Sequence, residues 1–374
     1  MDHSDLIPAT RARRARGITV RTSCITSRRH AADLVGRHGL ADRVDLTTHG
    51  DGISLSLREA AADDLAPGAD TLGLAARLGQ ASSPDDLDRE VLAAMLASPR
   101  ALDFPSVDEL DSALRIRRNI AEAAARTQLA FDTEAIERPE DCWRYDEDSG
   151  FTVRPGCPLI DALTKATQPN ASGRRYAFSC YRATEYVILL GLAQELAESN
   201  PALLAQLQAR WERKAIMSGA FHEAFLVEHG SIEAPLPERY YVPGDRVWFR
   251  NPDPVSADVA GYEGSWVIYL GGGRFSNFWQ PGAPFTLEHK CVEIYHWRDG
   301  VRPGADGEPM MDEDLVAAQV RRTLADPQRT QAIVERMWRL RDPRGVYASG
   351  GCIDASREST RFVRPQTSDI RLDV

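Results

Sequence analysis

Cys180 is the residue of this sequence best suited to nucleophilic chemistry. It stands in the segment FSCYRATEYVILLGLA, where a polar turn gives way to a long apolar stretch of helical character. A cysteine attacks a carbonyl carbon as its thiolate, so a catalytic cysteine needs a lowered pKa. A helix beginning at Ser179 or Cys180 would lower it, because unpaired N–H groups and the positive end of the helix dipole would face the sulfur. The same N–H groups could form an oxyanion hole.

The alternative for Cys180 is a purely structural role, since free cysteines are among the most buried residue types. A nucleophile also needs a base, and spacing does not single one out. Four histidines follow the cysteine, and each has a surface or hydrogen-bonded structural role as its alternative: His222, His229, His289 and His296. Asp245 lies in the segment PGDRVWF, where turn chemistry alone accounts for an aspartate.

The elements around Cys180 predict an α+β fold. Helices are expected from residue 84, where Pro84 and acidic residues precede an Ala/Leu-rich stretch, and after Ser106, which has Glu109 at capping-box spacing. Residues 133–175 are rich in turns, and helices follow Cys180. Strands are then expected in RYYVPGDRVWFRNPDP, in a hairpin around Gly271-Gly272-Gly273 and in KCVEIYHW. Residues 312–340 return to helix, and the remainder is expected to be an irregular tail.

The composition is that of an ordinary soluble globular protein. The chain has 374 residues, a net charge of −10 and 43% hydrophobic residues. That charge disfavours nucleic acid as a partner, and no apolar run reaches the roughly 20 residues that span a membrane. The first residues lack the apolar stretch of a signal peptide. Six scattered cysteines form neither a zinc motif nor a small disulfide scaffold, so we expect no metal, reduced thiols and a cytoplasmic location.

The chain from about residue 84 to 300 resembles the bacterial spore-coat-type protein-glutamine gamma-glutamyltransferases (transglutaminases). The resemblance is carried by LDFPSVDELDSALRIRRNIAEAAA, YAFSCYRATEYVILLGLA, YYVPGDRVWFRNPDP and YEGSWVIYLGGGRF, in that order. It implies a core related to papain-like and NlpC/P60 enzymes, in which a cysteine-headed central helix packs on a mostly antiparallel sheet. It also implies a cofactor-free reaction in which Cys180 forms a thioester with a glutamine side chain and a lysine amine resolves it to an isopeptide bond.

The sequence departs from that family beside the nucleophile. A glutamate usually precedes the cysteine, whereas this chain has Ser179, and a second family glutamate falls on Ser265. Glu263 could supply the missing carboxylate, because residues two apart in a strand point to the same face; a surface glutamate is its alternative. The family histidine falls on Asn277, which could orient a partner or donate to an oxyanion, or on Phe278, which could only pack. Glu263 is therefore the expected base or thiolate partner of Cys180, and His289 is the fallback.

The expected substrate-contacting residues are Ser179, Trp266, Phe278 and Trp279, with core packing as the alternative use of the aromatic ones. The expected domains are an N-terminal extension with a basic arm (1–80), the transglutaminase-like catalytic domain (84–300), and C-terminal helices with the tail (301–374). The expected partners are a protein or peptide glutamine donor and an amine acceptor. A glutamine deamidase or amidase on the same scaffold, and a non-catalytic binding or structural protein, are the alternatives.

Overall fold

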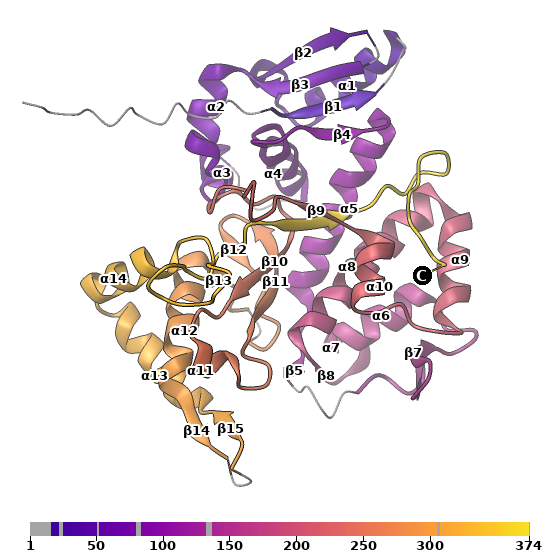
Figure 1. Ribbon diagram of the computed structural model, residues 1–374. Coiled ribbons are helices and arrows are strands. Elements are labelled where there is room, and N and C mark those ends of the chain that lie inside the picture. Colours follow the sequence, from indigo (N-terminus) through magenta and orange to yellow (C-terminus); the bar gives the residue numbers. More distant parts are fainter. Residues whose placement is uncertain are drawn as a thin grey trace, which may run out of the picture.

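The computed structural model describes residues 16–21, 25–50, 52–79, 84–131, 137–280, 282–304 and 307–373. They form a mixed α+β structure, as expected. Figure 1 shows a six-stranded sheet between two groups of helices, with a smaller sheet at one end of the molecule. Most of the basic arm expected near the N-terminus lies outside the described residues.

The smaller sheet is built from the N-terminal region. Its strand order is β2-β3-β1-β4; β3 runs antiparallel to both β1 and β2, and β4 is parallel to β1. Its strands are β1 (Ile18–Arg21), β2 (Val44–His49), β3 (Gly52–Leu57) and β4 (Leu102–Phe104). The accompanying helices are α1 (Ile25–Arg37), η1 (Ala41–Arg43), α2 (Glu59–Leu65), η2 (Pro67–Ala69), α3 (Leu74–Arg77) and α4 (Pro84–Leu96). One hydrophobic cluster joins Leu34 of α1 and Leu92 of α4 to Leu114 further along the chain, so the N-terminal region shares its core with later residues.

Two long helices cross in the middle of the molecule, α5 (Val107–Arg126) and α8 (Cys180–Ser199). The expected cap of the first is confirmed, because the Ser106 side chain accepts a hydrogen bond from the Glu109 N–H at 3.1 Å. The helices approach most closely where Gly191 of α8 faces Ile120 of α5; a Cβ added to the glycine would lie 2.5 Å from Cγ1 of Ile120. This close approach explains the glycine in an otherwise apolar helix.

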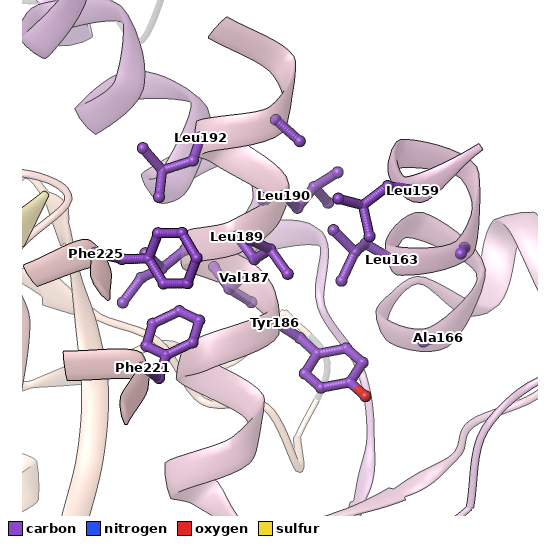
Figure 2. Packing of buried hydrophobic residues seen from close by; sticks show 14 of the residues in the cluster. Leu159, Leu163, Ala166, Tyr186, Val187, Leu189, Leu190, Leu192, Phe221 and Phe225 are labelled. Atoms are coloured by element: carbon purple, nitrogen blue, oxygen red, sulfur yellow. The ribbon is translucent and has the colours of Figure 1, made fainter. Parts of the chain in front are cut away.

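The remaining helices of this region enclose α8. Figure 2 shows Leu159 and Leu163 of α6 on one side of α8 and Phe221 and Phe225 of α10 on another. The elements of this region are β5 (Ala130–Phe131), β6 (Trp143–Asp146), β7 (Gly150–Val153), α6 (Leu159–Thr167), α7 (Pro169–Ser172), β8 (Ala177–Phe178), α9 (Pro201–Trp211) and α10 (Gly219–Phe225). Because the middle of α8, residues 186–193, is apolar around its circumference, it needs neighbours on every side.

The six-stranded sheet has the order β13-β12-β11-β10-β16-β9, and its strands pair antiparallel. Its strands are β9 (Leu226–His229), β10 (Arg246–Arg250), β11 (Gly264–Gly271), β12 (Arg274–Phe275), β13 (Phe285–Thr286) and β16 (Arg357–Thr360); the short helix α11 (Pro254–Ala257) connects β10 to β11. The expected hairpin at Gly271-Gly272-Gly273 is confirmed. Glu90 of α4 accepts a hydrogen bond from the Gly272 N–H at 2.9 Å, which joins this hairpin to the N-terminal region.

Two expectations for the later part of the chain are wrong. The segment KCVEIYHW is not a strand but part of helix α12 (Leu287–Gly300), because Thr286 caps it through the His289 N–H and its buried residues recur at helical spacing: Leu287, Cys291, Ile294 and Trp297. The tail is also not wholly irregular, since it contains β16, which lies between β10 and β9.

The expected helices of residues 312–340 are confirmed as α13 (Glu313–Leu324) and α14 (Pro327–Met337), which follow the hairpin of β14 (Val301–Pro303) and β15 (Pro309–Met311). They pack on α12, on the side of the six-stranded sheet away from α6 and α9 (Figure 1). Among the described residues, none of the helices has the length and apolar character that crossing a membrane requires.

The expectation of reduced thiols is wrong for one pair of cysteines. Cys142 and Cys157 form a disulfide across a separation of 15 residues. It closes the β6–β7 hairpin region beside α6, a proximity that the spacing of the cysteines does not reveal. Among the described residues, Cys180, Cys291 and Cys352 remain free.

Candidate active site

The first turn of α8 presents Cys180 at the position where helix N–H groups are unpaired. Ser179 precedes the helix in an extended conformation, and its side-chain oxygen accepts a hydrogen bond from the Arg182 N–H at 3.3 Å. Cys180 is therefore the first helical residue, and its side chain is partly exposed. The positive end of the dipole of a 20-residue helix lies beside the sulfur.

Cys180 lines a cavity of about 390 Å³, a size typical of small-molecule and side-chain binding sites. The cavity lies between the head of α8, the strand β11 and the helices α12 and α13. Its wall is mainly aromatic and aliphatic, and includes Phe131, Tyr262, Trp279, Phe285, Trp297, Val316, Val320 and Leu324. Phe131 contacts Trp279 with the ring centroids 5.2 Å apart, so two segments that are distant in the sequence meet in the wall of the cavity.

The surroundings of Cys180 act on its thiol in opposite directions. Burial raises the pKa of the thiol above its ordinary value, whereas backbone hydrogen bonds from Trp266 and Tyr181 and the charge of Lys290 lower it. The charge of Glu263 raises the pKa of this thiol further. The sulfur therefore faces two main-chain donors and one cation, and its resting form is the thiol.

His289 and Lys290, neighbours on α12, line the same cavity. Burial lowers the pKa of His289, so its imidazole is neutral at neutral pH and able to accept a proton. Lys290 is almost fully buried; its ammonium donates to Glu293 at 2.7 Å and lies 3.5 Å from the centroid of the Phe285 ring. Sequence reasoning missed Lys290 and Glu293, because their contact needs the helical spacing of a segment that was expected to be a strand.

The family model of protein-glutamine gamma-glutamyltransferases matches residues 71–372 of this chain. The chain belongs to the protein-glutamine gamma-glutamyltransferase family. A curated protein of that name from Halalkalibacterium halodurans is 26% identical over 193 residues, which cover 50% of this chain and 62% of the relative. The family match extends beyond the 84–300 resemblance on both sides and includes β16.

Asn277 and Phe278, the two positions that the family histidine could occupy, both make contacts of a structural kind. The Asn277 side chain lines the cavity, but it accepts from the Trp279 and Gln280 N–H groups and donates to the Ala283 carbonyl, so it shapes a turn. Phe278 is buried in the core around α8. Trp279, its neighbour, lines the cavity.

The other expected residues lie around the head of α8. Glu263 precedes β11 and is exposed, while Ser265, two residues later, lines the cavity. Trp266 stacks on Trp248 with an angle of 12° between the rings, and Ser179 caps the helix. The structure therefore brings Cys180, Asn277, Trp279 and His289 to one cavity, with Ser179, Glu263, Trp266 and Phe278 around it.

The other downstream histidines have partners away from Cys180. His222 pairs with Glu358 at 3.3 Å and His229 contacts the Ser359 hydroxyl at 2.8 Å, both on β16. His296 is fully buried against Asp299 and Thr323. Asp245 accepts from the Val242 N–H at 2.8 Å, which confirms its turn role, and it also accepts from Arg117 at 2.7 Å.

Proposed function

We propose that this chain transfers the acyl group of a glutamine side chain to a primary amine through a thioester on Cys180. The observation that carries the proposal is the position of Cys180 at the head of α8, in one cavity with the neutral His289. Family membership supports the same reaction. The donor would be a protein or peptide glutamine, and the acceptor a lysine amine.

The reaction proceeds in two balanced steps. The Cys180 sulfur attacks the carboxamide carbon as its proton passes to the base, and the C–N bond then breaks as ammonia leaves with that proton. The amine next attacks the thioester carbon, the C–S bond breaks, and the thiolate takes up the proton that the amine loses. Only the chain's own residues and the two substrates take part, so no cofactor enters the scheme.

His289 is the base in this proposal, because its depressed pKa keeps a free nitrogen available at neutral pH. Glu263 is the second candidate, since its charge acts on the thiol, and it would accept a proton from the incoming amine. The N–H groups of Tyr181 and Trp266 stabilise charge on the sulfur. Asn277 holds the turn that carries Trp279.

The cavity accommodates the glutamine side chain together with an apolar neighbour in the peptide. The proposed substrate contact is Trp279, which Phe131 supports from across the cavity. Three other residues support the wall and the nucleophile. Ser179 caps the helix that carries Cys180, Trp266 stacks on Trp248, and Phe278 packs in the core around α8. Water in place of the amine would make the same site a deamidase, which the experiment below distinguishes.

We also propose that α8 and the six-stranded sheet form a papain-like core of the NlpC/P60 type. The packing of α8 against β11 and the antiparallel strand pairs support this. In this view residues 84–300 supply α8 and every strand of the sheet except β16, and residues 301–374 complete the sheet with β16. The described part of residues 1–80 is an addition that shares a hydrophobic cluster with the core.

The disulfide bears on where the reaction takes place. Disulfides persist in oxidising compartments and are rare in the cytosol. The Cys142–Cys157 bond therefore favours an oxidising compartment over the cytoplasm expected from the sequence.

The test combines a glutamine peptide with a fluorescent primary amine, and follows amine incorporation and ammonia release together. We expect incorporation by the wild type and none by Cys180→Ala. Release of ammonia with no incorporation would identify a deamidase, and equal inactivity of the two proteins would refute both reactions and favour a binding protein.

The assignment of the base is tested with matched pairs. We expect His289→Gln to lower the rate on the order of 10²- to 10⁴-fold, the usual contribution of a general base, while His222→Gln, whose partner lies on β16, changes it little. Glu263→Gln is compared in the same way with Glu233→Gln, a change at another exposed glutamate that does not line the cavity. A rate for His289→Gln equal to that of His222→Gln would remove His289 from the mechanism.

A further inference from the structure

Arg246 of β10 is a charged side chain buried within the protein without the usual hydrogen bonds. It is 1% exposed, and within the described residues none of its three guanidinium nitrogens has a hydrogen-bond partner. Its nearest opposite charge is Glu358 of β16, at 3.3 Å from Nη1. Burying an arginine in this way is costly unless the surrounding groups hold the charge, so its contacts with other neighbours are informative.

Those neighbours are two aromatic rings from different elements. The guanidinium carbon lies 4.3 Å from the centroid of the Tyr181 ring and 4.2 Å from that of Trp266. The two rings also contact each other edge to face, with centroids 5.4 Å apart, and Trp248 stacks on Trp266. Cation–π contacts at these distances stabilise more strongly when the cation is desolvated, as it is here.

The residues that carry these two rings are also the residues whose main chain contacts the sulfur. Tyr181 follows Cys180 in the first turn of α8, and Trp266 lies in β11 opposite that turn. Backbone hydrogen bonds from both reach the Cys180 thiol. A single side chain thus contacts both segments that supply donors to the nucleophile.

We propose that Arg246 is a positioning residue that fastens β11 to the first turn of α8 and so holds the Tyr181 and Trp266 N–H groups against the Cys180 sulfur. The proposal deepens the proposed function, which it takes as its basis. Without the guanidinium, the two rings lose their shared partner and the donors separate from the sulfur.

Several other charges face this region and set the background for the test. Arg246 is faced by Glu185 of α8 and by Glu358, which it shares with His222 of α10. The sulfur is faced by Lys290 and His289 of α12 and by Glu263 before β11. Arg182 pairs with Glu185 within α8. None of these groups is altered in the variants below.

The experiment measures alkylation of Cys180 by iodoacetamide across pH in the full chain, with the modified peptide quantified by mass spectrometry. Thiolate formation controls this rate, so the profile reports the environment of the sulfur without requiring a substrate. We expect Arg246→Met to shift the profile to higher pH and to slow alkylation at pH 7 about tenfold. We expect Arg246→Lys to recover most of the rate, because an ammonium also binds ring faces.

The matched control is Arg357→Met. Arg357 is also 1% exposed and lies over an aromatic ring, 4.2 Å from the centroid of Tyr241, but it donates to the Asp354 and Ser356 carbonyls. Tyr241 packs in the hydrophobic cluster of β10, β11 and α12 and is not one of the two rings that contact Arg246. We expect this variant to lose stability while its alkylation profile stays at wild type. A second variant, Tyr181→Leu, removes one ring and leaves Arg246 in place. We expect it to shift the alkylation profile in the same direction, and it provides the test if Arg246→Met fails to fold.

An unchanged profile in folded Arg246→Met or in Tyr181→Leu would overturn the proposal, and so would an equal shift in Arg357→Met. The proposed function fails separately. If the profile shifts as expected but the wild type neither incorporates amine nor releases ammonia, the positioning role holds and the acyl transfer does not.

Discussion

Replacing Gly191 by alanine tests the central helix crossing, which fixes the course of the helix that carries Cys180. The added Cβ would lie 2.5 Å from Cγ1 of Ile120, 2.9 Å from its backbone nitrogen and 3.1 Å from its Cα. A change of rotamer can relieve the first contact only. The backbone contacts remain, so α5 and α8 must separate.

The size of the effect follows from two opposing contributions. Restoring the two backbone contacts from 2.9 and 3.1 Å to about 3.5 Å requires the helices to move apart by about 0.5 Å, and overpacking of this kind costs about 1–3 kcal/mol in a dense core. Alanine is favoured over glycine inside a helix by about 1 kcal/mol. The difference between these contributions is a loss of about 0–2 kcal/mol, and we expect Gly191→Ala to lower the free energy of unfolding by about 1 kcal/mol, the middle of that range.

Urea unfolding followed by circular dichroism measures this difference. The matched control is Gly36→Ala in α1, where an added Cβ meets nothing within 4 Å; helix propensity acts there without a clash, so we expect stabilisation of up to about 1 kcal/mol. If Gly191→Ala is as stable as the wild type or more so, helix propensity outweighs the clash, and the account of the close approach is wrong.

Three further predictions concern stability. Burial raises the pKa of Glu90 to about 7 from 4.5, so the stability that depends on its neutral form is complete below about pH 4.5 and is lost as the pH rises through 7. In urea unfolding, the free energy of unfolding of Glu90→Gln should match that of the wild type near pH 4.5 and exceed it by about 3 kcal/mol at pH 8.5. The same pH dependence in the two proteins would contradict this. Asp245→Ala leaves Arg117 buried without its carboxylate and should cost about 3–5 kcal/mol; a loss under 1 kcal/mol in the same assay would show that the charge finds another partner. Replacing Cys142 and Cys157 together by serine opens a loop of 15 residues and should lower stability by about 3 kcal/mol, with the reduced wild type as the control; a variant as stable as the oxidised protein would show that the bond adds nothing.

The sequence predicted the elements whose signals are local. The Ser106 cap, the Gly271-Gly272-Gly273 hairpin and the turn at Asp245 depend on residues a few positions apart, and the structure has all three. The family resemblance was likewise carried by short contiguous segments. The residues that determine these features are close together in the sequence, so the features can be predicted from one sequence without knowledge of the tertiary structure.

The features that sequence reasoning missed depend on distant parts of the chain. The strand β16 contains arginine, glutamate and serine and has no apolar alternation; it exists because β9 and β10 pair with it. The partners of Cys142 and Lys290 depend in the same way on how neighbouring elements pack. For α12, aromatic and β-branched residues favoured a strand locally, and the cap at Thr286 with a buried helical face decided otherwise.

The position of β16 in the sheet has a consequence for how the chain folds while it is being synthesised. A ribosome makes β9, β10 and β11 well before it makes residues 357–360, yet β16 must lie between β9 and β10. Such non-local pairing is slow and leaves strand edges open until it is complete. We therefore expect the nascent chain to hold an unfinished sheet until translation has passed β16, and we expect Cys180, whose helix packs on β11 of that sheet, to reach its native surroundings only then.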